Sequence, residues 1–278
     1  MTKQEKSQLE QTACNVRMGI ITGTHAAASG HPGGSLSAAD VITYLYKKVM
    51  KYDIANPRSE TRDRFVLSKG HCAPALYATL AEVGFFDKKE LLSLRHIGSF
   101  LQGHPNMNTV PGVDMSTGSL GQGISAACGM AKGAKLQNAN YRVYTLLGDG
   151  EIQEGQVWEA FMFAAHNKLD NLCVVIDNNG LQIDGKVADI CSPMPIDEKM
   201  QAFGFAVTKI DGNNFDELET AFEFAQQQKG KPTAIIMTTV KGKGVSFMEN
   251  AVGWHGKAPN DEEYEKAMAE LTATKANI

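Results

Sequence analysis

The chain has 278 residues, of which 43% are hydrophobic and 21% charged, a composition typical of a folded globular protein. Lysine and arginine total 27 and aspartate and glutamate total 31, so the formal net charge is 27 − 31 = −4. A protein that coats nucleic acid needs an excess of basic residues, so no nucleic-acid partner is expected. The absence of a glycine repeat excludes collagen-like and low-complexity classes. We expect one domain over residues 1–278.

Neither a membrane segment nor a secretion signal is predicted. No apolar run approaches the roughly 18 residues of a membrane-spanning helix, and the N-terminal sequence MTKQEKSQLEQ lacks an apolar core. The five cysteines are widely scattered without a CxxC motif, which favours reduced structural thiols over disulfides or a zinc site. We therefore expect a cytoplasmic protein with no membrane partner.

The first half of the chain is predicted to be mainly helical. A helix is expected over residues 4–28, before a glycine-rich loop at 29–34. The segment from Ser37 to Asp40 resembles a capping box, so a second helix is expected to begin there. The other expected elements are a strand over 64–68, a helix over 73–83, an irregular region over 96–117 and a helix over 120–137.

The second half alternates apolar strands with helices. A strand over 141–147 runs into Gly148-Asp149-Gly150, apolar residues then recur at helical spacing from Val157, and a second strand covers 172–176. Continuous apolar strands separated by helices predict a mostly parallel sheet covered on both faces, which is a three-layer α/β/α architecture. The remaining expected elements are strands over 205–210 and 233–240, a helix over 215–228 and a helix beginning near 260–263.

Polar side chains follow two consecutive strands of the predicted sheet. Asp149 comes directly after one strand, and Asn178 and Asn179 end the next, so all lie at the edge where ligands bind. Glycines and a helix N-terminus suit a diphosphate, but the Asp149 carboxylate would repel it unless a divalent cation such as Mg²⁺ lay between them. A turn at Gly180 would add the carbonyl oxygen of Leu181. The alternative is two sheet-edge turns built from ordinary turn residues.

The sequence resembles the transketolase family of thiamine-diphosphate enzymes. The GDG and NN segments are similar to the cofactor motif of the superfamily, and the resemblance implies the thiamine-diphosphate-binding fold. A deoxyxylulose-phosphate synthase typically lacks the Glu-Gly pair at 154–155 and the WHG segment. The segments specific to transketolase run through nearly the whole chain in family order: SGHPGG at 29–34, KGH at 69–71, QGHP at 102–105, STGSLGQG at 116–123, GDGEIQEGQ at 148–156 and GWHGK at 253–257.

The resemblance implies two sets of binding residues. The implied ligands of a divalent metal ion, Mg²⁺ or in its place Ca²⁺ or Mn²⁺, are Asp149, Asn179 and the backbone of Leu181. The implied contacts of thiamine diphosphate are His71, Gly150 and Lys241 at the diphosphate, Gly118, Ser119 and Leu120 at the aminopyrimidine, and in addition Asn179 and His255. The alternative to a diphosphate contact for Lys241 is a solvated lysine in the KGKG turn.

Four of the seven histidines lie beside a glycine in loops, namely His31, His71, His104 and His255. Imidazoles donate to sugar hydroxyls and move protons near neutral pH, so these loops indicate a ligand-binding cleft. The resemblance implies that His31 and His255 contact the substrate around the C1 hydroxyl and carbonyl oxygen of a ketose. It implies proton transfer and oxyanion stabilisation for His104, so that His31, His104 and His255 are the expected catalytic residues.

No segment of this sequence matches the family's ring-activating glutamate, which comes from a separate pyrimidine-binding domain. We therefore expect the N-terminal, diphosphate-binding subunit of a split transketolase. Its expected partner is a C-terminal subunit that carries the pyrimidine-binding and C-terminal domains, and the two are expected to form a heterotetramer. The resemblance places Glu154 at this subunit interface, and the alternative is an exposed glutamate on a helix.

The expected activity, with that partner, is transfer of a two-carbon ketol (glycolaldehyde) unit from a ketose phosphate to an aldose acceptor, as in the pentose phosphate pathway. One alternative is another thiamine-diphosphate ketol transferase, either similar to deoxyxylulose-phosphate synthase or specific for a sulfosugar. A second alternative, from a different class, is a cofactor-binding module with no turnover of its own.

Overall fold

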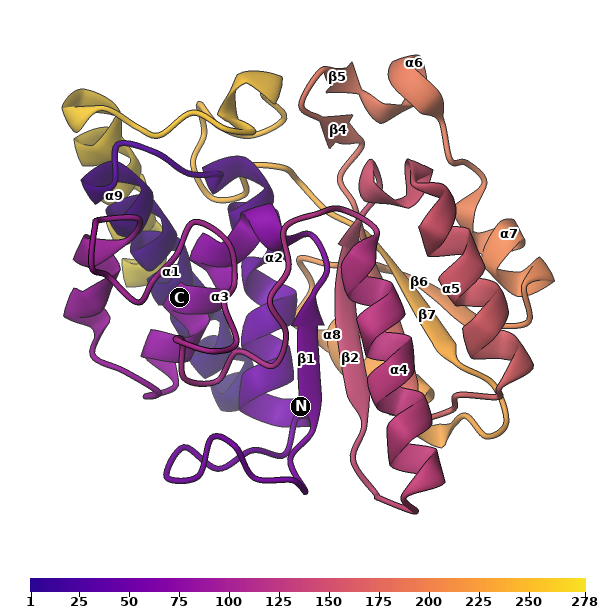
Figure 1. Ribbon diagram of the computed structural model, residues 1–278. Coiled ribbons are helices and arrows are strands. Elements are labelled where there is room, and N and C mark those ends of the chain that lie inside the picture. Colours follow the sequence, from indigo (N-terminus) through magenta and orange to yellow (C-terminus); the bar gives the residue numbers. More distant parts are fainter.

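A five-stranded sheet forms the centre of the computed structural model, which describes residues 1–278 (Figure 1). The strands lie in the order β1-β2-β3-β7-β6, and every neighbouring pair is parallel, which confirms the predicted sheet. The strands are β1 (Arg64–Leu67), β2 (Val143–Gly148), β3 (Leu172–Asn178), β6 (Ala206–Asp211) and β7 (Thr233–Thr238).

Helices cover both faces of this sheet, which confirms the three-layer prediction (Figure 1). Successive side chains along a strand point to opposite faces, so in β2 Tyr144 and Leu146 enter one core while Val143 and Leu147 enter the other. The helices of the first core are α1 (Lys3–Ala26), α2 (Pro32–Tyr44), α3 (Ala73–Glu82), α8 (Phe215–Gln227) and α9 (Asp261–Ala276). Those of the second are α4 (Gln122–Leu136), α5 (Gly155–His166) and α7 (Ile196–Ala202).

Short elements connect these layers. A two-stranded antiparallel hairpin of β4 (Leu181–Gln182) and β5 (Gly185–Lys186) is followed by α6 (Val187–Cys191). A π-helical turn covers Leu45–Val49, and 3-10 turns cover Gly70–Cys72, Lys88–Ser93, Glu151–Gln153 and Val252–Trp254. No helix combines the length and the apolar character needed to cross a membrane.

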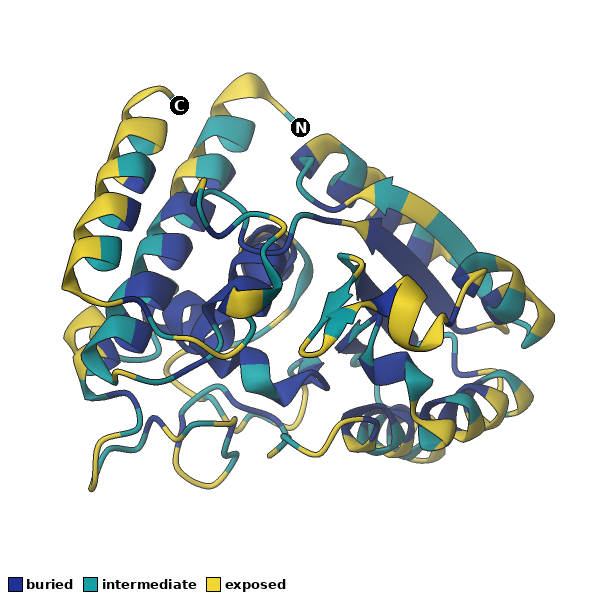
Figure 2. Cartoon of the chain, turned by 90° about the horizontal axis from the view of Figure 1, so that it is seen from above, coloured by how far each residue is buried: buried dark blue, intermediate teal, exposed yellow.

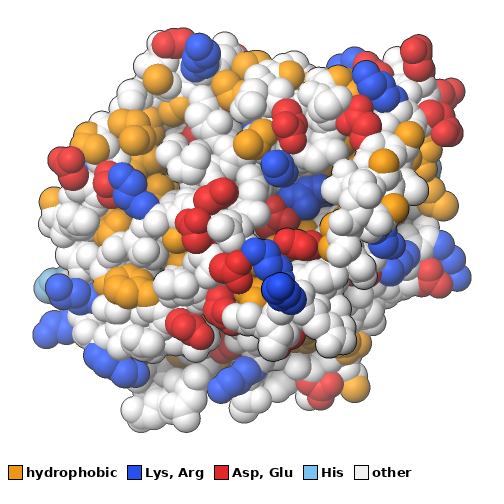
Figure 3. Space-filling view, turned by 180° about the vertical axis from the view of Figure 1, so that it is seen from behind, with side chains coloured by type: hydrophobic (Ala, Val, Ile, Leu, Met, Phe, Trp, Pro, Cys, Tyr) orange, Lys and Arg blue, Asp and Glu red, His pale blue; other side chains and the backbone are white.

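Burial follows the layers. Seen from above, buried residues concentrate in the sheet and on the helix faces turned toward it, while exposed residues occupy the outer helix faces (Figure 2). On the face seen from behind, acidic and basic side chains are interspersed, so neither sign of charge dominates there (Figure 3).

The order in which the chain adds strands to the sheet reverses between β3 and β7. Strands β1, β2 and β3 follow one another across the sheet, whereas β6 lies at the opposite edge and β7 returns to lie beside β3. Helix α5 connects β2 to β3 over one face, whereas α8 connects β6 to β7 over the other. In open parallel sheets such a reversal leaves a crevice at the carboxyl ends of the strands, where ligands bind. The crevice lies beside the ends of β2 and β3, where the sequence predicted the site.

Two predicted helix starts were wrong. Helix α2 begins at Pro32, because proline is favoured in the first turn of a helix, and Ser37 lies buried inside α2 instead of capping it. The GDG segment does not enter an α-helix directly. A 3-10 turn over Glu151–Gln153 intervenes, and α5 starts only at Gly155. A helix N-terminus therefore does not lie immediately after Gly150.

Candidate active site

A cavity of about 210 Å³ opens at the carboxyl ends of β2 and β3. Its walls come from segments far apart in the sequence, which meet because parallel strands end at the same edge of the sheet. The residues predicted from sequence that line it are His71, Leu120, Asp149, Gly150, Asn179, Leu181, Lys241 and His255.

Asp149 is a buried carboxylate without a cationic partner. It follows the last residue of β2, and only 2% of its surface is exposed. Its Oδ1 accepts a hydrogen bond from the Gly150 amide at 2.9 Å, and its Oδ2 accepts one from the Gly180 amide at 2.5 Å. Burial, reinforced by the nearby charge of Asp177, raises the pKa of Asp149 to about 6. This carboxylate therefore accepts only backbone hydrogen bonds and forms no direct ion pair.

Asn179 and Leu181 bring two further oxygen atoms to the cavity. The Asn179 side-chain amide donates to Asp177 at 3.1 Å, which fixes which end of the amide is the oxygen, and Oδ1 accepts from the Leu181 amide at 3.1 Å. The three predicted metal ligands therefore line one cavity. They offer a carboxylate, an amide oxygen and a carbonyl, the oxygen donors that Mg²⁺ prefers. No cluster of three or more His, Cys, Asp or Glu side chains suited to a metal exists in the structure.

Lys241 is not a solvated turn lysine, because only 2% of its surface is exposed. Its ammonium group donates to the carbonyl oxygen of Leu181 at 3.0 Å and lies 2.9 Å from Nδ1 of His255. Neither partner is a carboxylate, and burial lowers the pKa of this lysine. Lys241 therefore presents a buried positive charge to the cavity without a carboxylate in hydrogen-bond contact.

A second buried lysine was not singled out by the sequence reasoning. Lys69 donates to the carbonyl oxygen of Gly34 at 3.0 Å and forms an ion pair with Asp177. Asp177 also accepts from Ser37 at 2.6 Å and from Thr239. Burial alone would lower the pKa of Lys69 and raise that of Asp177, but their mutual attraction outweighs it and both remain charged. The sequence signal that could have identified this pair is a charged residue at or just after the end of each of two apolar strands.

Glu151 is a third buried charge beside the cavity that sequence reasoning missed. Its carboxylate accepts from the hydroxyl of Ser68 at 2.5 Å and from the amides of Gly121 and Gly148 at 3.0 and 3.1 Å. These partners belong to the end of β1, the start of α4 and the end of β2. Glu151 therefore ties together three of the segments that form the cavity wall.

The four loop histidines form one cluster, of which His71 and His255 line the cavity. The ring of His31 lies 5.4 Å from His71, 5.6 Å from His255 and 6.4 Å from His104, centroid to centroid. Burial lowers the pKa of His31 to about 4 and that of His255 to about 3. It also lowers the pKa of His71 and, less strongly, of the exposed His104. All four rings are therefore neutral at pH 7.

The segment predicted to face an aminopyrimidine borders this cluster. Gly118 has φ +155°, and a Cβ at this position would lie 3.1 Å from the His104 ring, so the close approach requires glycine. Leu120 lines the cavity, while Ser119 is exposed between them and does not line it. Glu154 is also exposed and lines the cavity at the N-cap of α5.

Residues 9–276 match the family described as "Transketolase, thiamine diphosphate binding domain". The chain belongs to this transketolase family. It is 47% identical over 242 residues to the "6-deoxy-6-sulfo-D-fructose transketolase subunit SqwG" of a Clostridium species, covering 87% of this chain and 88% of that one. It is also 47% identical over 260 residues to human transketolase, covering 92% of this chain and 40% of the human one.

The fold agrees with solved transketolases. A crystal structure of transketolase from Campylobacter jejuni superposes with a TM-score of 0.88 at 32% identity, over 97% of this chain and 45% of that chain. The transketolase-family chain described here thus spans less than half the length of the human and Campylobacter proteins, but most of the length of the clostridial subunit.

Proposed function

We propose that this chain is the diphosphate-binding subunit of a two-subunit transketolase. One observation carries the proposal: Asp149 and Lys241 line the same cavity, both are buried, and neither has an oppositely charged hydrogen-bond partner. Buried charges are expensive unless they are paired. A diphosphate together with a divalent cation would pair both, the cation with Asp149 and the phosphate oxygens with Lys241.

The residues of the cavity fit thiamine diphosphate and a metal ion. Asp149, the Asn179 side chain and the Leu181 carbonyl would hold Mg²⁺, Ca²⁺ or Mn²⁺. Lys241, His71 and the backbone of Gly150 would contact the diphosphate, and a Cβ at Gly150 would lie 3.1 Å from the Gln182 side chain, so this wall is kept free of a side chain. The segment from Gly118 to Leu120 would face the aminopyrimidine. When bound, thiamine diphosphate supplies the carbon nucleophile for ketol transfer.

The histidine cluster supports sugar binding and proton transfer beside this cofactor. A neutral imidazole has one donor and one acceptor nitrogen, so it can hold a hydroxyl and a carbonyl oxygen in one orientation. His31 and His255, whose rings are 5.6 Å apart, would orient the C1 hydroxyl and carbonyl of a ketose. His104 lies at the exposed edge of the cluster, where it would exchange a proton with the substrate.

The partner in this proposal is a C-terminal transketolase subunit with the pyrimidine-binding domain and its glutamate. The clostridial relative is itself named a subunit and has a similar length, which supports a divided enzyme. The two hydrophobic cores lie on opposite faces of one sheet, which supports a single cofactor-binding domain over residues 1–278. Two copies of each chain would form the heterotetramer.

A reconstitution assay tests the proposal. The purified chain is mixed with the product of a neighbouring reading frame that carries the missing glutamate, together with Mg²⁺ and thiamine diphosphate. Ketol transfer to an aldose is then followed from two donors, xylulose 5-phosphate and 6-deoxy-6-sulfofructose. We expect no transfer by either chain alone and transfer by the mixture, and the preferred donor separates a phosphosugar enzyme from a sulfosugar enzyme.

Two other results would contradict parts of the proposal. Turnover by this chain alone, with contaminating partner excluded by mass spectrometry, would overturn the two-subunit enzyme. Tight binding of thiamine diphosphate without transfer in the mixture would favour a non-catalytic cofactor-binding module.

A further inference from the structure

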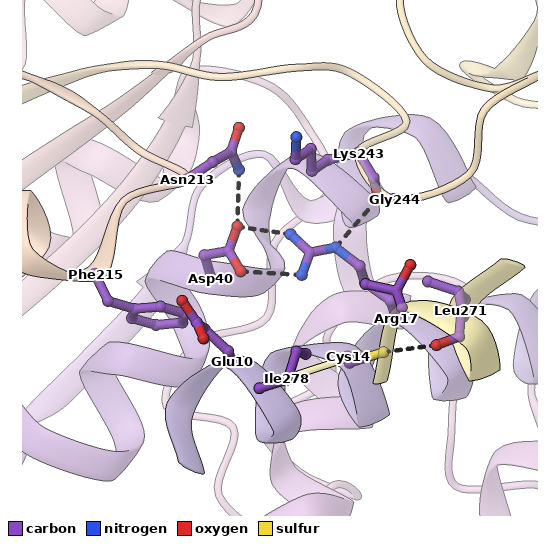
Figure 4. Close-up of a pocket in the computed structure, with 11 residues that line it drawn as sticks. Glu10, Cys14, Arg17, Asp40, Asn213, Phe215, Lys243, Gly244, Leu271 and Ile278 are labelled. Carbon is purple, nitrogen blue, oxygen red and sulfur yellow. Dashed lines mark hydrogen bonds and ion pairs between the residues drawn. The ribbon is translucent and has the colours of Figure 1, made fainter. Parts of the chain in front are cut away.

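A second cavity, of about 290 Å³, lies where α1, α2 and α9 meet the loop after β7 (Figure 4). Its centre is a bidentate ion pair: the Nη1 and Nη2 atoms of Arg17 donate to the two carboxylate oxygens of Asp40 at 3.0 and 2.6 Å. Asn213 donates to the same carboxylate at 2.8 Å. Only 8% of the surface of Arg17 and 4% of that of Asp40 is exposed, so this network belongs to the protein interior.

The third guanidinium nitrogen of Arg17 holds the loop that carries Lys241 in place. Its Nε donates to the carbonyl oxygen of Lys243 at 3.1 Å, and Figure 4 shows the guanidinium lying between the Asp40 carboxylate and this backbone. The flanking residues are Gly242 at φ +83° and Gly244 at φ +94°. A Cβ at Gly242 would lie 2.2 Å from the Met248 carbonyl oxygen, so the loop is held in a conformation that only glycine adopts there.

Each residue of the ion pair is connected to a segment that reaches the active-site cavity. Arg17 holds the carbonyl two residues beyond Lys241, whose ammonium group contacts His255 and the Leu181 carbonyl. Asp40 belongs to α2, and near the start of this helix the carbonyl oxygen of Gly33 accepts a hydrogen bond from the Gly242 amide at 2.9 Å. The pair therefore fixes the Lys241 loop relative to the helix that follows His31.

A buried ion pair is often no more stabilising than apolar residues of the same shape, so stability alone gives no reason for one here. A bidentate arginine does fix geometry, because its planar fork matches a carboxylate in one orientation. We propose that Arg17 and Asp40 are positioning residues. They hold the Lys241 side chain in the position and orientation in which its ammonium group contacts the cofactor diphosphate. The inference rests on the proposed role of Lys241 and goes beyond it by naming what holds that lysine in place.

Amide hydrogen exchange of the full chain without cofactor tests the positioning directly. In Arg17→Gln we expect the hydrogen-bonded amides of Gly242, Gly244 and Asn250 to exchange at least about tenfold faster, while amides of β2 and β3 keep their rates. The matched control is Arg62→Gln, whose ion pair with Asp114 has similar side-chain exposure, 13% and 4% against 10% and 6%. The control should leave the three loop amides unchanged. Faster exchange throughout the chain in Arg17→Gln, matching its global loss of stability, would overturn the inference.

A double-mutant cycle adds a readout that a merely structural role would not move. In the assembled two-subunit enzyme, Arg17→Gln should weaken thiamine diphosphate binding about tenfold in the wild-type background and have no further effect in Lys241→Ala. Equal effects in both backgrounds would overturn the inference. An assembled wild-type enzyme that bound no thiamine diphosphate would instead overturn the proposed function, and the exchange rates of the chain would still decide the positioning.

A milder variant keeps the test decisive if Arg17→Gln does not fold. Asn213→Ala leaves the ion pair in place and removes only one hydrogen bond to Asp40. It should speed exchange of the same three amides about three- to tenfold, as expected for the loss of one such bond. Unchanged exchange at all three amides in this variant would contradict the role of the network.

Discussion

The side-chain nitrogen of Lys241 lies 2.9 Å from Nδ1 of His255. An ammonium group has only protons to donate, so Nδ1 accepts this hydrogen bond. Burial lowers the pKa of His255 to about 3, so the ring is neutral and carries its single proton on Nε2. The buried lysine therefore selects the tautomer that the histidine presents to a ligand.

The first prediction follows from this contact. Nitrogen NMR of the labelled chain at pH 7 should show His255 as the neutral Nε2–H tautomer. In Lys241→Met the acceptor role of Nδ1 is lost, and the Nδ1–H tautomer should become populated. Lys257→Met, which changes an exposed lysine paired with Glu263, should leave the His255 signals unaltered. A cationic ring at pH 7 in the wild-type chain would contradict the assignment.

Acid should destabilise the fold through the buried histidines. The folded state keeps His31 neutral down to about pH 4, whereas the unfolded chain protonates histidine near pH 6.5. The unfolded state therefore binds more protons between these values, and the contribution of His31 to stability, complete above about pH 6.5, is lost as the pH falls toward 4.

Urea unfolding at a series of pH values from 7 to 4 measures this effect. The free energy of unfolding should fall less steeply toward acid in His31→Gln than in the wild type, and the exposed His166→Gln should match the wild type. The comparison isolates His31 from Asp149, whose raised pKa acts in the opposite sense. Identical slopes for His31→Gln and the wild type would show that folding does not lower the pKa of His31.

Removing the carboxylate of Asp149 should abolish metal-dependent cofactor binding. In the assembled two-subunit enzyme, Asp149→Ala should weaken Mg²⁺-dependent thiamine diphosphate binding by more than about 100-fold, since even indirect supporters of metal ligands contribute up to that much. Asn179→Ala should weaken it less, because a neutral ligand is lost. Asp184→Asn, an exposed carboxylate in the β4–β5 turn, is the control. Unchanged calorimetric affinity in Asp149→Ala would rule out the metal assignment.

His104 should affect turnover more than substrate binding. In the assembled enzyme, His104→Ala should lower kcat by about 10²- to 10⁴-fold with a smaller rise in KM, because a proton-transfer group acts mainly in the transition state. Steady-state kinetics of His96→Ala, an exposed histidine outside the cluster, should match those of the wild type. A raised KM with normal kcat in His104→Ala would assign this residue to uniform substrate binding.

Breaking the buried ion pair of Lys69 and Asp177 should lower the free energy of unfolding more than breaking any ion pair on the surface. Lys69→Met leaves Asp177 charged and uncompensated in the interior, so the free energy of unfolding should fall by about 3–5 kcal/mol. Adding Asp177→Asn should recover part of this loss. Lys209→Met breaks an exposed pair with Asp197 and should cost no more than about 1 kcal/mol. Urea unfolding measures all three variants, and equal losses for Lys69→Met and Lys209→Met would contradict the argument.

The sequence alone determined the parallel sheet, its two covered faces and the strand ends at which the site lies. These features are local: apolar runs define strands, helical periodicity defines the covering helices, and Asp149 and Asn179 follow directly after strands. The same local signals placed His31, His71, His104 and His255 on loops, and the resemblance to transketolases supplied their expected roles.

Only the tertiary structure decided which of these residues share a cavity and what each one pairs with. β7 inserts between β3 and β6, which brings Lys241 beside Leu181 and buries a lysine that its turn sequence allowed to be solvated. The pairing of Lys69 with Asp177 joins the ends of β1 and β3, strands that are not neighbours in the sheet. Burial and ion pairing depend on which distant segments pack together, and no local pattern of residue types contains that information.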